Sequence, residues 1–200
     1  MYPHLMDADC RKMMDFLRQR GGVRASQRAK PMSGAALRQV ILTASPQVAM
    51  TVITMWGSIS RHADLCRLFS TRVTQEYVEI NFNTFKSDRY GLRAVTKFMS
   101  TPPSIKSYVS QTPVFASYRE VLSAIKRVDP SLSTYSIRTA AISALADAGY
   151  SFPDIALLSG HVPQVDVGVA VRRYNQPTVS QPEGRKQMEL SAHLASLIFP

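Results

Sequence analysis

The sequence has little cysteine. Cys10 and Cys66 are the only two among 200 residues, and neither lies in a CxxC pair or a Cys/His cluster. A disulfide framework and a structural zinc site are therefore not expected, and a reducing compartment is the default. His62 and Cys66 stand at i, i+4, but two ligands without a third are a weak metal signal.

Long apolar runs are also missing. The opening residues, MYPHLMDADC, lack the charged start and apolar run of a secretory signal. No stretch approaches the roughly 18 apolar residues that cross a bilayer. We expect a soluble intracellular protein, in the cytoplasm and nucleoid or in the nucleus depending on the host, and no membrane partner.

Acidic residues are scarce relative to basic ones. The chain has 24 Lys and Arg against 14 Asp and Glu, a formal net charge of +10. This excess favours a polyanionic partner, with nucleic acid ahead of an anionic membrane surface. Hydrophobic residues make up 45% of the chain, which is enough for one folded domain with a core.

Periodicity predicts an α+β fold, mainly α-helical with a small antiparallel sheet. Residues 76–82 alternate apolar and polar side chains like a strand, and a turn at 87–91 leads to a second strand, giving a hairpin with Lys86 near its tip. A Pro-Pro pair at 102–103 then breaks the chain. Helices are expected at 6–20, 35–43, 46–59, 61–69, 116–128, 137–148 and 183–199. Ser33 or Gly34 would cap the second of these, and Gly149 would end the helix at 137–148. A capping box at 151–154 marks the start of one more short helix. The segment 162–177 is ambiguous between strand and helix.

Five side chains of types that suit phosphodiester chemistry lie in separate short motifs along the chain. Arg61 lies in GSISRHADLCRL, which has the form G-x-x-x-R-x-x-[DE]-L-x-x-L, and Lys86 follows on the hairpin. Arg138 ends YSIR, His161 ends LLSGH and Tyr174 ends RRY. Guanidinium groups stabilise charge on a phosphoryl group because they are always charged and bind two oxygens at once.

In this order, the motifs resemble the catalytic domain of the tyrosine recombinases (phage integrase family) over residues 47–176. The resemblance implies that Arg61 and Arg138 hold the scissile phosphate, that Lys86 protonates the departing 5′-oxygen, and that His161 donates to a phosphate oxygen. Tyr174 would attack phosphorus and form a 3′-phosphotyrosine intermediate. No metal or other cofactor is implied.

Three features depart from the family pattern. Tyr135 occupies the position where H-x-x-R usually has histidine, and it either donates a hydrogen bond or only packs. Asp64 stands where glutamate is common, as a supporting acceptor. Twelve residues separate His161 from Tyr174, more than is typical.

Each predicted site residue also has an ordinary structural interpretation. Arg61 and Arg138 could be solvated arginines at helix starts, and His161 could cap the preceding helix. Two further cations, Arg89 and Lys97, compete with Lys86 for the role of the acid. A tyrosine at position 150 competes with Tyr174, although it follows a helix-ending glycine and is expected to pack.

Further cations are weaker candidates for DNA-phosphate contacts. Arg172 and Arg173 flank Tyr174, while Arg24, Arg28 and Lys30 lie in a Gly- and Ser-rich basic segment that is either a solvated arm or a contact to the DNA backbone.

The sequence therefore predicts an N-terminal helix and basic arm (1–34), a recombinase-like catalytic domain (35–178) and a C-terminal helix (179–200). That last helix either covers its own core or docks on a neighbouring protomer. The expected function is breakage and rejoining of double-stranded DNA by a homo-oligomer, a dimer or tetramer assembled on the DNA. The alternatives are a non-catalytic DNA-binding descendant of a recombinase and, more weakly, a basic helical regulator.

Overall fold

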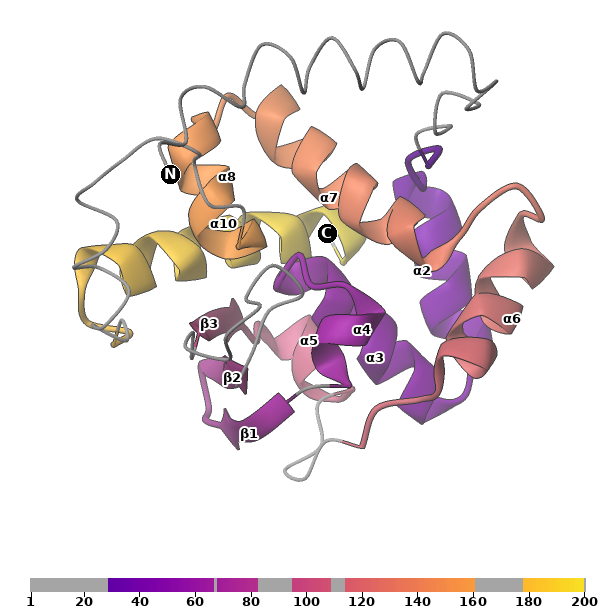
Figure 1. Ribbon diagram of the computed structural model, residues 1–200, viewed down its shortest axis with the longest axis horizontal. Helices are drawn as coiled ribbons and strands as arrows, with labels where there is room; N and C mark the ends of the chain where they lie inside the picture. The colour runs from indigo at the N-terminus through magenta and orange to yellow at the C-terminus, as the bar shows by residue number, and fades with distance from the viewer. Residues whose placement is uncertain (1–28, 67, 83–94, 109–113, 161–177, 200) are drawn as a thin grey trace, which may run out of the picture.

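The computed structural model describes residues 29–66, 68–82, 95–108, 114–160 and 178–199. In these ranges the chain is mainly helical with one small antiparallel sheet, as the sequence predicts (Figure 1). The elements are α2 (Gly34–Thr43), α3 (Pro46–Gly57), α4 (His62–Leu65), β1 (Leu68–Val73), β2 (Tyr77–Phe82), β3 (Val95–Ser100), α5 (Pro103–Lys106), α6 (Tyr118–Val128), α7 (Thr134–Asp147), α8 (Phe152–Ser159) and α10 (Pro182–Ile198).

Serine side chains start several of these helices where the sequence predicts starts. Ser33 Oγ accepts a hydrogen bond from the backbone of the third helical residue of α2, and Ser45 does the same for α3. Ser117 and Glu120 form a reciprocal capping box at α6, and Ser151 caps α8. Each cap satisfies a backbone N–H that has no partner within its helix.

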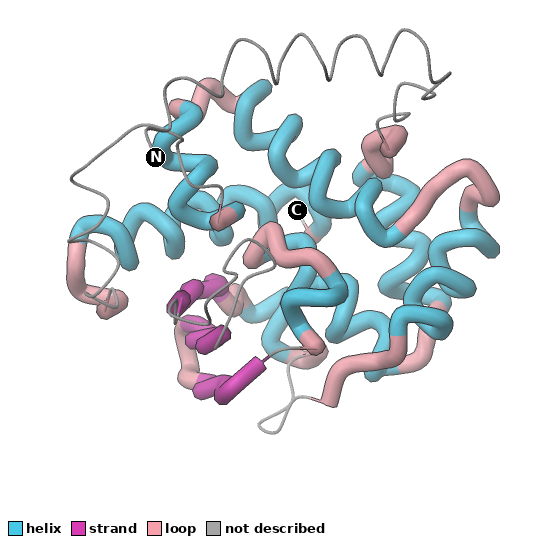
Figure 2. Tube along the Cα trace, in the orientation of Figure 1, coloured by secondary structure: helices cyan, strands magenta, loops and turns pink. Residues whose placement is uncertain are grey.

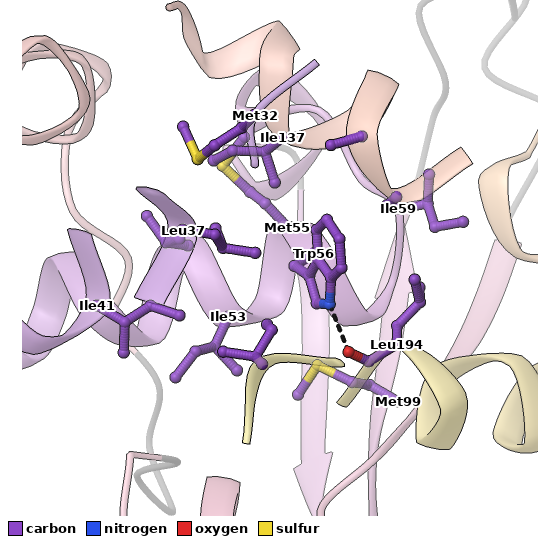
Figure 3. Packing of buried hydrophobic residues seen from close by; sticks show 14 of the residues in the cluster. Met32, Leu37, Ile41, Ile53, Met55, Trp56, Ile59, Met99, Ile137 and Leu194 are labelled. Atoms are coloured by element: carbon purple, nitrogen blue, oxygen red, sulfur yellow. Dashed lines mark hydrogen bonds between the residues drawn. The ribbon is translucent and has the colours of Figure 1, made fainter. Parts of the chain in front are cut away.

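Helix α3 forms the centre of the core. Val48 and every residue after it in the helix are buried, and α2, α6, α7, α10 and β3 pack around it (Figures 1 and 2). Trp56 Nε1 donates a hydrogen bond of 2.8 Å to the carbonyl oxygen of Leu194 on α10 (Figure 3). Leu190, Leu194 and Ile198 are fully buried. The terminal helix therefore covers the core of its own chain.

Replacement of Trp56 by phenylalanine should lower the free energy of unfolding by at least about 1–3 kcal/mol. The change removes the indole N–H that donates to the carbonyl of Leu194. It also leaves a smaller ring in a fully packed core, and the lost hydrogen bond and packing together carry a cost of that size. The loss is measured by urea unfolding followed by circular dichroism. A stability equal to that of the wild type would contradict the importance of this link between α3 and α10.

The sheet contains a strand that the sequence analysis missed. The predicted hairpin is present: β2 pairs antiparallel with β3, and Val78, Ile80 and Phe82 alternate inward. However, the helix predicted for 61–69 is present only at its start, because α4 ends at Leu65 and β1 begins at Leu68. Strand β1 pairs with β2 along its length, and this tertiary pairing overrides a local helical pattern.

Other boundaries differ less. Helix α7 starts at Thr134, three residues before its predicted start, because the backbone N–H of Ser133 donates to Ser136 Oγ and fixes the first turn. The predicted break at the Pro-Pro pair is the start of α5. Gly149 follows α7 with φ of +85°, as expected for a helix-ending glycine.

Several predicted features lie outside the described residues: the helix at 6–20, most of the basic arm, the hairpin turn and the segment 162–177. Within the described ranges, none of the helices combines the length and apolar character that crossing a membrane requires.

Candidate anion-binding site

Arg61 is held at the start of α4 by the acid of its own motif. It is the half-buried N-cap residue of the helix, and the carboxylate of Asp64 accepts a 2.9 Å hydrogen bond from its backbone N–H. Asp64 is only 2% exposed. The R-x-x-D spacing therefore closes one helical turn and fixes the backbone from which the Arg61 side chain extends.

Arg138 is buried, with 1% of its surface exposed. From the first turns of α7 it donates Nη1–H to the carbonyl oxygen of Ile59 and Nη2–H to that of Ser159, the latter at 2.8 Å. One guanidinium thus joins α7, the turn between α3 and α4, and the end of α8. The solvated interpretation of Arg138 is wrong.

A third cation, Lys97, reaches the same turn from the sheet. Its side chain is fully buried, and Nζ donates to the carbonyl oxygen of Ser58 at 2.9 Å and to Ser60 Oγ at 3.2 Å. The ammonium lies 5.6 Å from the ring centre of Phe82 on β2. Lys97 and Arg138 therefore bind neighbouring residues of one short backbone segment.

The charges of these groups affect one another. Burial lowers the pKa of Lys97 well below its ordinary value, and the charges of Arg138 and Arg61 lower it further, while Asp64 opposes them. Burial and the charge of Arg61 also lower the pKa of Arg138 to about 10. Among the described residues, three cations therefore share this region with a single carboxylate. These positive charges repel one another, and a nearby negative charge would offset that repulsion.

Tyr135 lies one turn before Arg138 and belongs to this cluster. It is 47% exposed. A hydrogen bond and an electrostatic interaction between Tyr135 and Arg138 raise the pKa of Arg138 and so oppose the effect of burial. Tyr135 thus interacts with the guanidinium of Arg138 and is also accessible from solvent.

The turn that Lys97 and Arg138 bind has an unusual backbone. Ile59 has φ of +48°, and it is the one residue other than glycine with positive φ in the described part of the chain. A β-branched residue in this left-handed region is strained by about 1–3 kcal/mol. Such strain persists only where surrounding contacts hold it, and the bonds from Lys97 and Arg138 to this turn are such contacts.

Only part of the predicted site can be located. Arg61, Asp64, Tyr135 and Arg138 come together. The remaining candidates Lys86, His161, Tyr174, Arg172, Arg173, Arg24 and Arg28 lie outside the described residues.

Two other residues considered in the sequence analysis have structural partners. Lys30, a predicted DNA contact, forms an ion pair of 3.1 Å with Asp129 and is 63% exposed. His62 is buried and donates Nε2–H to the carbonyl oxygen of Ala116 at 2.8 Å. In the described ranges no group of three or more metal-ligating side chains is found.

Sequence reasoning considered Lys97 only as a rival acid and missed its buried position. The signal lies in the hairpin register: Lys97 is paired with Ile80, whose side chain points into the core. Paired residues project on the same face of a sheet, so this register buries the lysine.

Burial of Lys97 predicts a pH dependence of stability. The unfolded lysine keeps its proton to about pH 10.4, whereas the folded one releases it at lower pH, so the unfolded state binds more protons between these values. Stability should therefore rise with pH in that window, by up to about 1.4 kcal/mol per pH unit. Urea unfolding at a series of pH values up to about 10 should show a flatter profile for Lys97→Met, and identical slopes would contradict the depressed pKa.

Comparison of the chain with protein-family models gives no match, and comparison with curated proteins gives none either.

Proposed function

We propose that this protein breaks and rejoins DNA strands as a tyrosine recombinase, with the cluster around Arg61 and Arg138 binding the scissile phosphate. The observation that carries the proposal is the placement of these two arginines. They come from separate motifs far apart in the sequence, yet Arg138 donates to the carbonyl oxygen of Ile59, two residues before Arg61. The charge of Arg61 accordingly lowers the pKa of Arg138. An arginine with a purely structural role needs only its hydrogen bonds to carbonyl oxygens. A second arginine and a lysine close to it favour the binding of an anionic ligand.

The proposed reaction assigns one step to each remaining motif residue. The hydroxyl of Tyr174 releases its proton to solvent as its oxygen attacks phosphorus. The bond between phosphorus and the 5′-oxygen breaks as Lys86 protonates that oxygen. His161 donates a hydrogen bond to a nonbridging oxygen, and the arginines stabilise the charge that develops there. Attack by a 5′-hydroxyl on the 3′-phosphotyrosine reverses the step and releases Tyr174, so no external energy source is needed.

The net charge of +10 supports double-stranded DNA as the substrate, because phosphate contacts dominate such binding. In the proposal, exchange of strands requires a dimer or tetramer on the DNA. The buried face of α10 is occupied by the chain's own core, so the protomers would meet through other surfaces.

The test is a covalent trapping assay on duplex DNA with a nick close to the cleavage position, so that a short fragment diffuses away and prevents rejoining. The proposal predicts a protein–DNA adduct that survives denaturant. Salt-sensitive binding without an adduct would instead support the non-catalytic DNA-binding alternative. No DNA binding at low salt would contradict both functions.

A further inference from the structure

The segment Ser58–Ile59–Ser60 joins α3 to Arg61. Both serines are fully buried, and Ser58 Oγ donates to Ser60 Oγ at 2.8 Å. Ile59 is also fully buried and has a positive φ; its side chain is seen with the core residues in Figure 3. The position of Arg61 depends on this turn because it is the next residue along the chain.

Two cations bind the turn through different atoms. Lys97 binds the carbonyl of Ser58 and the hydroxyl of Ser60, while Arg138 binds the carbonyl of Ile59 between them. If the contacts of Lys97 were lost, the turn could relax from its strained conformation, and the acceptor that orients Arg138 would move with it.

We propose that Lys97 is a positioning residue that holds the turn at 58–60 and thereby fixes the Arg61 and Arg138 side chains for binding one anion. This inference rests on the proposed function, because it assumes that the cluster binds phosphate. Lys97 itself is fully buried and acts through the turn, so it is distinct from the predicted proton donor Lys86.

Stability alone does not favour a lysine at this position. A methionine has similar length and would avoid the cost of burying an amine, although it would leave the Ser58 carbonyl and Ser60 Oγ without this donor. What methionine lacks is the ability to donate to the turn. The lysine at this position is therefore better explained by its hydrogen bonds, which fix the turn, than by the space that it fills in the core.

The charged groups that face Lys97 explain how anion binding and Lys97 are coupled. Arg138 faces it from α7, and Arg61 and Asp64 from α4, while β2 contributes only the ring of Phe82 among the described residues. An anion bound by the arginines offsets their repulsion of the Lys97 ammonium. Binding should therefore favour the protonated lysine and take up protons.

The experiment compares Lys97→Met with Lys106→Met, which makes the same change at an exposed residue on α5. Inorganic phosphate is titrated while the guanidinium signals of Arg138 are followed by NMR, and thermal unfolding is recorded for each protein. We expect Lys97→Met to bind phosphate at least 10-fold more weakly and to show altered Arg138 signals while it is still folded at the temperature of the titration. Lys106→Met should stay within twofold of the wild type.

Ser60→Ala provides a second variant in case Lys97→Met does not fold. It removes one acceptor of Lys97 by a small change, and it should weaken phosphate binding in the same direction. The positioning role would be overturned if Lys97→Met bound phosphate within twofold of the wild type and showed unchanged Arg138 signals. If Lys97→Met is unfolded, the same result in Ser60→Ala would overturn it.

Arg138→Ala separates this role from the proposed function. If the wild type binds phosphate and Arg138→Ala does not, the anion site stands whatever Lys97→Met shows. If the wild type itself shows no phosphate binding, the anion site fails, and both the proposed function and the role of Lys97 fail with it.

Discussion

Replacement of Tyr174 by phenylalanine should abolish the covalent protein–DNA adduct, a loss of at least about 10⁴-fold in strand cleavage. Phenylalanine has no oxygen to attack phosphorus, while its ring keeps nearly the same size and shape. DNA binding should therefore stay close to that of the wild type. Denaturing gels of the trapped nicked duplex measure the adduct, and a filter-binding titration at fixed salt measures affinity.

The matched control is Tyr150→Phe. Tyr150 is half-buried and stacks edge-on against His193 with ring centres 5.5 Å apart, which is a packing role. This variant should form the adduct at nearly the wild-type rate. An adduct that persists in Tyr174→Phe, or one that disappears only in Tyr150→Phe, would show that the nucleophile has been assigned to the wrong tyrosine.

Replacement of Arg138 by alanine should lower the rate of strand cleavage by about 10²–10³-fold, the usual effect of removing one donor that stabilises developing charge. The variant also leaves the carbonyls of Ile59 and Ser159 without their donor, so stability should fall as well. Cleavage must therefore be measured at a temperature where circular dichroism shows the variant to be folded. Single-turnover kinetics on the nicked duplex give the rate.

Arg127→Ala is the control for loss of one positive charge. Arg127 is exposed on α6 and lines an open cleft of about 490 Å³. Its removal should weaken DNA binding slightly and leave the single-turnover rate unchanged. Equal rate losses in Arg127→Ala and Arg138→Ala would mean that general charge, and not a phosphate site, accounts for the effect.

Local features of the sequence predicted most of the fold. Ser33, Ser45 and Ser151 mark helix starts because their hydroxyls satisfy backbone N–H groups within one turn. The alternation in β2 shows which face is buried because side chains in a strand alternate between faces. The motifs around Arg61 and Arg138 likewise predicted arginines near helix starts: Arg61 is the N-cap residue of α4, and Arg138 is the fifth residue of α7.

Features that depend on distant pairing were not predictable. The first two residues of strand β1 were assigned to a helix and the others to no element, because only the pairing with β2 identifies this strand. The position of Lys97 depends on the register between β2 and β3, which no local pattern specifies. The positive φ of Ile59 was not predictable for the same reason, because the turn is held by Lys97 from β3 and Arg138 from α7.

The central claim is that Arg61 and Arg138 bind the same phosphate. A crystal structure of the protein with a nicked duplex, in which Tyr174→Phe keeps the DNA uncleaved, tests it most directly. The proposed function predicts one backbone phosphate within about 2.7–2.9 Å of guanidinium nitrogens from both arginines. A duplex bound elsewhere, for example across the cleft beside α6, with no phosphate at Arg61 and Arg138, would contradict it.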